Sequence, residues 1–271
     1  MPSAKAQRLQ IYYRDYIAVV SLSRAEMANA LDLPAWREIR SVFKQLNTNP
    51  QVRVIILRGE GKHFCSGIDL SVFADLLSVD AESGRKSEAL RQFILDLQAD
   101  LTAIEQCSKP VLVAVHGACI GAGLDMICCA DMRYASADAR FCVKEVDLAI
   151  TADVGTLQRL PKLIADGVAR ELAYTARTID AQEAQQLGLI NRVFADENEL
   201  EREVFKIAGQ IAAKSPLAIR GTKEMLVYTR DHSVADGLRY VATWNAGMLS
   251  EVDVSEAIRA SMTAEPPKFL D

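Results

Sequence analysis

One stretch of the chain, from His116 to Asp153, restricts its possible folds more than any other segment. It combines a glycine-rich turn with three carboxylates, Asp125, Glu145 and Asp153, in otherwise apolar sequence. The apolar run VLVAV precedes it, and a helical pattern from Val154 follows it. Because buried elements lie on both sides, we expect the acids at loop and helix ends that face an interior, where functional side chains are common.

The segments before this stretch alternate between strand and helix patterns. β-branched and aromatic residues over 9–22 predict a hairpin, and VRVIIL at 52–57 predicts a short buried strand. Apolar residues recur at helical spacing over 33–46 and again over 85–106. Residues 78–88 are polar and contain glycine, which indicates a mobile connection beside a pocket. This alternation predicts a layered α/β fold.

The segments after the stretch are mainly helical. Helical patterns cover 156–176 and 180–187, and LINRVF at 189–194 predicts a short strand. We expect a core over residues 1–196 and a C-terminal helical region over 197–271. The helical region has more apolar residues than a peripheral helix pair could bury. Two explanations stay open, a subunit interface and a layer that covers its own core.

Composition excludes some classes of function. With 36 Asp and Glu against 31 Lys and Arg, the net charge is −5, which argues against a nucleic-acid partner. Six cysteines without paired metal-ligand spacing indicate buried thiols in a reducing compartment. We find neither a signal peptide nor an apolar run of membrane-spanning length, and the ending KFLD is not a peroxisomal address. We therefore expect a soluble, cytoplasmic protein without a membrane partner.

Two loops, HFCSGID and CIGAGLD, share a design of small residues followed by an acid. Glycine lets backbone N–H groups approach a ligand, and the start of a helix leaves N–H groups unpaired. Two such amides on one oxygen would form an oxyanion hole, in which one donor contributes about 2.7 to 4 kcal/mol to transition-state stabilisation. Taken alone, each motif is a weak signal, because glycine between a strand and a helix more often reflects ordinary turn chemistry.

With these motifs in place, the chain resembles the enoyl-CoA hydratase/isomerase, or crotonase, superfamily. The matching segments span most of the chain in family order, and they are LSRAEMANAL, HFCSGIDL, HGACIGAGLDMICCADMRYAS, TLQRLPKLI, TARTIDAQEAQQLGLINRVF and SPLAIRGTKEML. The resemblance implies a spiral of repeated β-β-α units with a C-terminal helical region. It also implies an acyl-CoA thioester substrate, a place in fatty acid β-oxidation, no metal and no cofactor, and a homotrimer or homohexamer.

The resemblance also implies roles for particular residues. The amides of Ile68 and Ala122 would bind the thioester oxygen, although the second position is usually glycine in the family. Lys268 and Phe269 would contact the CoA of a neighbouring subunit, a weaker transfer because the ending AEPPKFLD departs from the family pattern. The residues that match the CoA-binding stretches are Arg24, Met27, Ala28, Ser66 and Ile68.

Each of the three acids also has a simple structural explanation. Asp125 could interact with a helix dipole, Glu145 could pair with Lys144 or Arg140 at the surface, and Asp153 could cap a helix. All three positions nevertheless match acids of the dienoyl-CoA isomerases, which KEVDLAITADVGTLQRLPK resembles most. Like charges about 5 Å apart repel by about 3 kcal/mol at an effective dielectric near 20, so at least one acid should hold a proton.

This resemblance implies isomerisation of a 3,5-dienoyl-CoA to the 2,4-dienoyl-CoA. Our hypothesis is that Asp153 removes the C2 proton, Glu145 delivers a proton at C6, and Asp125 polarises or shuttles nearby. The alternative is an enoyl-CoA hydratase, which uses two glutamates. Here Asp125 replaces the first glutamate, and Asp153 stands where hydratases usually have glycine. A simple enoyl isomerase would leave two acids unexplained. A non-enzymatic RNA-binding protein or scaffold would need a basic patch, and a hydrolase would need a nucleophile elbow.

Overall fold

A computed structural model describes residues 7–72, 82–263 and 265–271. Within these ranges, six strands form the larger sheet in the order β1-β2-β3-β4-β6-β9. The strands are β1 Leu9–Arg14, β2 Ile17–Leu22, β3 Val54–Gly59, β4 Val111–Val115, β6 Met132–Ser136 and β9 Arg192–Phe194. β1 and β2 form the antiparallel hairpin predicted over 9–22, and every later pair is parallel.

The two apolar runs form central strands because both faces of the larger sheet are covered. In β3, Ile55 and Leu57 pack into one core, whereas Val54 and Ile56 pack into the core on the opposite face. β4 alternates in the same way. Since successive side chains of a strand point to opposite faces, a strand buried on both faces needs a continuous apolar sequence.

A smaller sheet lies beside the larger one. It contains β5 Ala118–Ile120, β7 Arg140–Cys142 and β8 Ile179–Asp180 in the order β5-β7-β8. The chain leaves β4, adds β5 to the small sheet, and returns through helix α4 (Ala122–Cys128) to β6. This β-β-α passage places the start of α4 between the two sheets.

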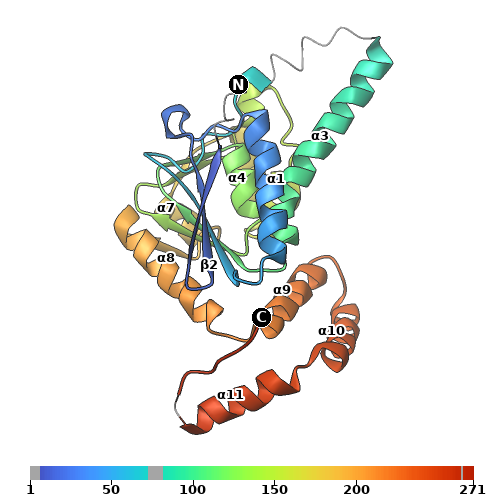
Figure 1. The fold of residues 1–271 in the computed structure, drawn as a ribbon. Helices are drawn as coiled ribbons and strands as arrows, with labels where there is room; N and C mark the ends of the chain where they lie inside the picture. The colour runs from blue at the N-terminus through green and yellow to red at the C-terminus, as the bar shows by residue number, and fades with distance from the viewer. Residues whose placement is uncertain (1–6, 73–81, 264) are drawn as a thin grey trace, which may run out of the picture.

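Helices cover both faces of the larger sheet. Helices α1 (Leu33–Thr48) and α3 (Ser83–Gln106) pack against each other on one face, and the N-terminal end of α3 projects beyond the body (Figure 1). Helix α8 (Glu197–Ala212) covers the opposite face with Leu200, Val204 and Ala208. Within the connection predicted at 78–88, residues 78–81 lie outside the described residues, and from Ser83 the chain is helical rather than a loop.

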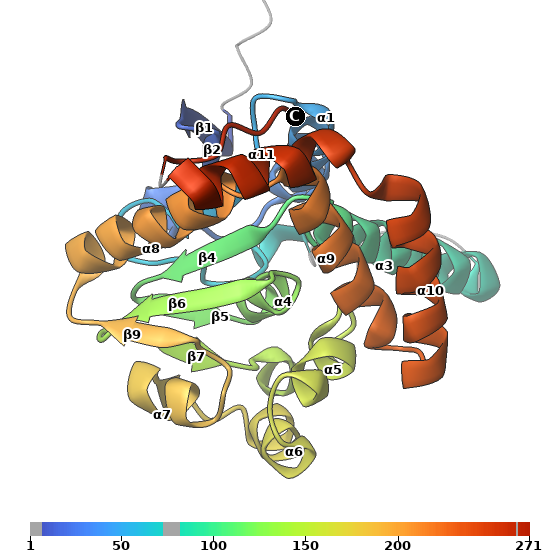
Figure 2. The same cartoon turned by 90° about the horizontal axis from the view of Figure 1, so that it is seen from below.

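The remaining helices follow the smaller sheet and form the C-terminal part. They are α5 Thr156–Arg159, α6 Asp166–Thr175, α7 Ala181–Gln186, α9 Pro216–Thr229, α10 Val234–Met248 and α11 Glu251–Thr263. The part of the chain that the structure describes also contains three 3-10 turns, η1 Ala25–Met27, η2 Glu145–Leu148 and η3 Leu160–Lys162. Helices α9 to α11 group at one end of the molecule, and α11 extends away from the sheet (Figures 1 and 2).

The cysteines lie in the interior of the protein. All six cysteines are free and buried, as the apolar context of their positions predicts. Burial raises the pKa of the Cys65 and Cys128 thiols to about 12, so they stay protonated at neutral pH. No helix in the described part of the chain is long and apolar enough to cross a membrane.

Candidate active site

The two small-residue loops meet between the sheets. The backbones of Cys65 and Cys119 pair in an isolated parallel β-bridge. The Ile120 amide donates a hydrogen bond of 3.0 Å to the Cys65 carbonyl. Gly67 has a φ of +103°, and a Cβ atom there would lie 3.1 Å from the Ile120 oxygen and 3.7 Å from the Ala122 nitrogen. Glycine is therefore required at position 67 for the loops to approach this closely.

The amides of Ile68 and Ala122 are available at this junction. Ala122 is the first residue of α4, so its N–H has no acceptor within the helix. On the other loop, Gly67 and Asp69 exchange hydrogen bonds of 2.8 and 3.0 Å with Leu31, which fixes the peptide groups around Ile68. Within residues 7–72, 82–263 and 265–271, neither amide donates to a protein acceptor.

Ile68 and Ala122 both line a cavity of about 590 Å³. One wall is apolar and comes from α3, where Leu90, Phe93, Ile94 and Leu97 follow helical spacing. The remaining lining residues come from the loops and from η2, and they are Met27, Ala30, Trp36, Ser66, Gly67, Ile68, Asp69, Leu70, Ile120, Gly121, Ala122, Asp125, Lys144, Glu145, Leu148, Ile150, Asp153 and Val154. The cavity therefore joins an apolar wall to the three predicted acids and to Asp69, which is paired with Arg24.

Asp125 is the most deeply buried acid, with no exposed surface. It lies in the first turn of α4, and its Oδ1 accepts a hydrogen bond of 2.6 Å from the Thr156 amide. Burial, and then the negative charge of Glu145, raise the pKa of Asp125 to about 7. This acid can therefore keep its proton near neutral pH.

Glu145 begins η2 beside the second loop. Gly121 has a φ of +52°, and a Cβ atom there would meet the Glu145 Oε1 at an ordinary contact distance of 3.5 Å, so backbone conformation rather than space favours glycine. Burial raises the pKa of Glu145, and backbone hydrogen bonds from the Glu145 and Lys144 amides oppose this rise. The Asp125 Oδ2 and Glu145 Oε2 atoms are buried and have no hydrogen-bond partner among the described residues. Because the pKa of Asp125 is raised to about 7, a proton on this carboxyl relieves the repulsion between the two acids.

The surface-pair explanation of Glu145 is wrong. Lys144 forms its ion pair with Asp147 at 2.5 Å, and Arg140 donates to the carbonyls of Ala137 and Ala139. Neither cation neutralises Glu145, which instead lines the cavity.

Asp153 lies in the irregular segment between η2 and α5. It does not cap α5, because the N-cap residue of that helix is Gly155, so the capping explanation is also wrong. Burial of the half-buried carboxyl raises its pKa. Its backbone carbonyl accepts a hydrogen bond of 2.6 Å from Gln98 of α3. All three predicted acids thus line one cavity, and all three bind protons more tightly than exposed carboxylates.

The residues expected to bind CoA divide into two groups. Met27, Ser66 and Ile68 line the cavity. The Arg24 guanidinium does not; it donates to Asp69 at 2.6 Å and to the Ala30 carbonyl at 3.0 Å, which ties two loops together.

The other expected CoA contacts also lie outside the cavity lining. The Ala28 carbonyl accepts the Ser66 amide at 3.0 Å. Phe269 lines a groove between α9, α10 and α11, and the Lys268 amide donates to Glu256.

Several residues of the site carry no local sequence signal. Gln98 and Thr156 bond to the acids from positions that look like ordinary helix residues. The apolar face of α3 was recognisable from its spacing, but the sequence did not indicate that Leu90 and Phe93 would face a cavity rather than a core.

Comparison with known proteins defines the class of protein to which this fold and site belong. The profile of the Enoyl-CoA hydratase/isomerase family matches residues 13–270. The chain belongs to the enoyl-CoA hydratase/isomerase, or crotonase, family. Enoyl-CoA hydratase from Bacillus anthracis has a similar structure, with a TM-score of 0.89 and 31% identity over 97% of this chain and 99% of that chain. The predicted α/β crotonase-like fold with a C-terminal helical region is confirmed.

Similar curated sequences narrow the class. The peroxisomal Δ3,5-Δ2,4-dienoyl-CoA isomerase of Arabidopsis thaliana is 50% identical over 251 residues, 92% of this chain and 90% of that protein. The mitochondrial enzyme of the same name from Rattus norvegicus is 43% identical over 258 residues, 94% of this chain and 79% of that protein. A crotonyl-CoA hydratase from Syntrophomonas wolfei is 36% identical over 90% of this chain and 84% of that protein.

Proposed function

We propose that this chain is a Δ3,5-Δ2,4-dienoyl-CoA isomerase, which converts a 3,5-dienoyl-CoA thioester to the conjugated 2,4-dienoyl-CoA. The observation that carries the proposal is the position of Asp153, which lines the cavity together with Asp125 and Glu145 and, like them, has no cationic partner among the described residues, unlike Asp69. Relatives named as this isomerase, with 38 to 50% identity, support it. A proton shift between carbons four bonds apart needs two separated acid and base groups, and this arrangement supplies them.

The proposed reaction moves one proton along the substrate. Asp153 removes the C2 proton, and the electron pair of the C–H bond spreads through the diene to the thioester oxygen. The amides of Ile68 and Ala122 bind that oxygen and stabilise the dienolate. Glu145 then delivers a proton to C6, and Asp125, whose pKa is raised to about 7, can replace it. The cycle closes when the proton on Asp153 returns to this acid pair.

Hydration of a 2-enoyl-CoA is the alternative function. The Syntrophomonas wolfei relative named crotonyl-CoA hydratase keeps this alternative relevant. A hydratase has no evident use for a third buried acid, because burying a carboxylate beside an acyl chain is costly.

A direct assay separates the two functions. The protein is incubated with a 3,5-dienoyl-CoA while absorbance of the conjugated 2,4-diene is followed, and hydration of crotonyl-CoA is measured in parallel. We expect isomerisation to dominate. Hydration without isomerisation would reject the proposed function.

We also propose that the active form is a homotrimer or a hexamer of two trimers, with residues 197–271 supplying contacts. Apolar side chains of α10 and α11 are exposed in the single chain, including Val234, Leu238 and Val252. Helix α8 belongs to the same sequence region, but it packs on the sheet, so the proposed contacts concern α9 to α11. Light scattering of the purified protein tests this assembly.

The compartment and the CoA contacts stay predictions. The names of relatives place them in peroxisomes and mitochondria, whereas we predicted a cytoplasmic protein; cell fractionation distinguishes these locations. For CoA, the proposed contacts are Arg24, Met27, Ala28, Ser66 and Ile68. Because the Arg24 side chain bonds within the protein, we expect its contribution to come through the conformation of its loop.

A further inference from the structure

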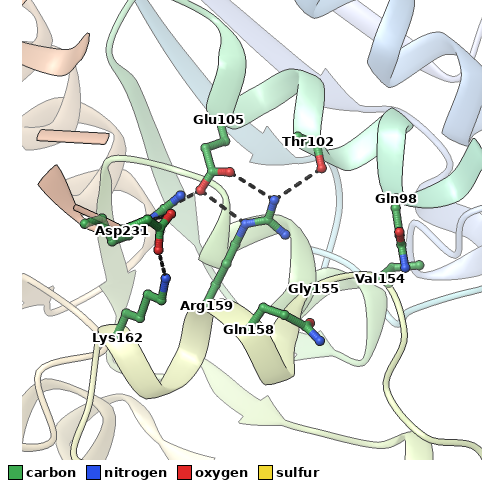
Figure 3. Close-up of a pocket in the computed structure, with 10 residues that line it drawn as sticks. Gln98, Thr102, Glu105, Val154, Gly155, Gln158, Arg159, Lys162 and Asp231 are labelled. Atoms are coloured by element: carbon green, nitrogen blue, oxygen red, sulfur yellow. Dashed lines mark hydrogen bonds and ion pairs between the residues drawn. The ribbon is translucent and has the colours of Figure 1, made fainter. Parts of the chain in front are cut away.

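A second, polar cavity of about 340 Å³ lies behind the segment that carries Asp153 (Figure 3). Its lining residues are Gln98, Thr102, Glu105, Val154, Gly155, Gln158, Arg159, Lys162, Arg230 and Asp231. Val154 lines both this polar cavity and the acid-lined cavity. Residues 151–155, around Asp153, therefore form a wall segment between the two cavities.

The charged side chains of the polar cavity bond to one another. Arg159 donates to Glu105 at 3.0 Å and to Thr102 at 3.2 Å, and Arg230 donates to Glu105 at 2.5 Å. Lys162 pairs with Asp231. These pairs join α3 to the α5 region, so both sides of the polar cavity are held in place (Figure 3).

Gln98 is the residue of this cavity that reaches the wall. Its Nε2 donates a hydrogen bond of 2.6 Å to the backbone carbonyl of Asp153. The backbone at Gln98 is fixed in place, because its neighbours on α3, Leu97 and Leu101, are buried in the main core. The bond connects positions 55 residues apart in sequence.

Besides the burial of Ala152 and Val154, the wall segment is held by backbone hydrogen bonds to the other two acids. At one end, the Ile150 amide donates to the Glu145 carbonyl at 3.0 Å. At the other end, the Thr156 amide donates to Asp125 Oδ1 at 2.6 Å. Residues 151–154 have no helical or strand conformation between these anchors. The Gln98 bond is thus the attachment at the centre of the segment, on the residue whose carboxyl enters the active cavity.

We propose that Gln98 is a positioning residue for Asp153: its amide fixes the peptide of Asp153 so that the carboxyl reaches C2 of the substrate. This role rests on the proposed isomerase function. Proton transfer needs a donor–acceptor distance of about 2.6 to 3.2 Å. A displacement of about 1 Å can lower the rate about 100-fold. Because the bond is to the backbone of Asp153, its loss should affect the chemical step rather than substrate binding.

The test compares the same substitution at two glutamines of the polar cavity. Gln98→Met keeps the length of the side chain and removes the donor. Gln158→Met is the matched control, since Gln158 lines the same cavity and its exposed side chain makes no hydrogen bond to the wall among the described residues (Figure 3). We expect Gln98→Met to lower kcat about 10- to 100-fold with KM changed by less than about twofold. Gln158→Met should keep both values.

Hydrogen–deuterium exchange supplies a readout that does not depend on activity. In Gln98→Met, the amides of residues 151–155 should exchange faster than in the wild type, whereas those of α4 should not change. Unchanged exchange over 151–155, or an unchanged kcat in an active enzyme, would overturn the positioning role. A wild-type protein without isomerase activity would instead reject the proposed function, and the exchange data would still decide whether Gln98 holds the segment.

Discussion

Asp125, Glu145 and Asp153 have similar chemistry but different surroundings. Asp125 is fully buried and bonded to the Thr156 amide, whereas Glu145 and Asp153 are partly open to the cavity. Burial raises all three pKa values, and for Asp125 the value is about 7. These differences suit the proposed roles, in which Asp125 stores a proton and the other two acids reach the substrate.

Neutral substitutions of the two cavity-facing acids test their proposed roles. In Asp153→Asn and Glu145→Gln, isomerisation should fall about 100- to 10,000-fold, because neither amide can exchange a proton. Binding of CoA, measured by calorimetry, should stay within about threefold of the wild type, since CoA is expected at the loop side of the cavity. Full activity in Asp153→Asn would remove this residue from the mechanism.

Asp125→Asn tests the proton on the buried acid through stability. The raised pKa means that the folded state binds this proton more tightly than the unfolded state does. Binding of this proton stabilises the folded state. The stabilisation is complete below the unfolded pKa near 3.8 and is lost as pH rises through about 7. Asparagine resembles the protonated acid at every pH.

The variant should therefore gain stability relative to the wild type at pH 8 but not at pH 3.5. Each tenfold change in proton affinity corresponds to about 1.4 kcal/mol, so the gain at pH 8 can reach about 4 kcal/mol. Denaturant unfolding at both pH values measures it. An equal difference at the two pH values would show that Asp125 does not hold the proton.

At the level of elements, the sequence predicted the strands and helices that have a clear apolar pattern. The strand predicted at 52–57 appears as β3, Val54–Gly59, and the run VLVAV appears as β4. Strands β5 and β8 were not predicted, because two or three residues are too few to show an alternating pattern, and the five-residue β6 was also missed. The helical pattern over 156–176 is divided at η3, where Pro161 interrupts the hydrogen-bonding sequence.

In the site, too, the sequence predicted local motifs but not contacts between distant segments. The family resemblance identified the three acids, and the structure brings them into one cavity. The bond between Gln98 and Asp153 could not be predicted, because it joins a helix residue to a loop carbonyl without any local motif. Contacts of this kind depend on how α3 crosses the fold.

The close approach of the two loops predicts that Gly67 is essential for activity. Gly67→Ala should reduce kcat/KM at least about 100-fold, because the added methyl group and the positive φ would displace the Ile68 amide. Gly209→Ala in α8 is the control, since a Cβ atom there meets nothing within 4 Å. The control should keep its activity and gain about 0.5 to 1 kcal/mol of stability. Steady-state kinetics and thermal unfolding measure both variants, and normal kinetics in Gly67→Ala would contradict the proposed oxyanion hole.

At the scale of the molecule, the C-terminal helices leave an apolar surface. Val252 and Met262 of α11 are 69% and 82% exposed in the single chain. If this surface forms subunit contacts, Val252→Asp and Met262→Asp should reduce the assembly toward the 29.8 kDa monomer, because a buried unpaired carboxylate costs several kcal/mol. Tyr174→Asp, at an exposed position of α6, should leave the assembly unchanged. Sedimentation measures the masses, and an unaffected oligomer would place the contacts elsewhere.

The burial of all six cysteines has a practical consequence for experiments on this molecule. Alkylating reagents need an accessible thiolate, and thiols with a pKa near 12 supply almost none at neutral pH. The native protein should therefore react slowly with maleimides. A single cysteine introduced at an exposed position such as Tyr174 could carry a fluorescent label without removal of the native thiols. Subunit exchange could then be followed by energy transfer between labelled copies.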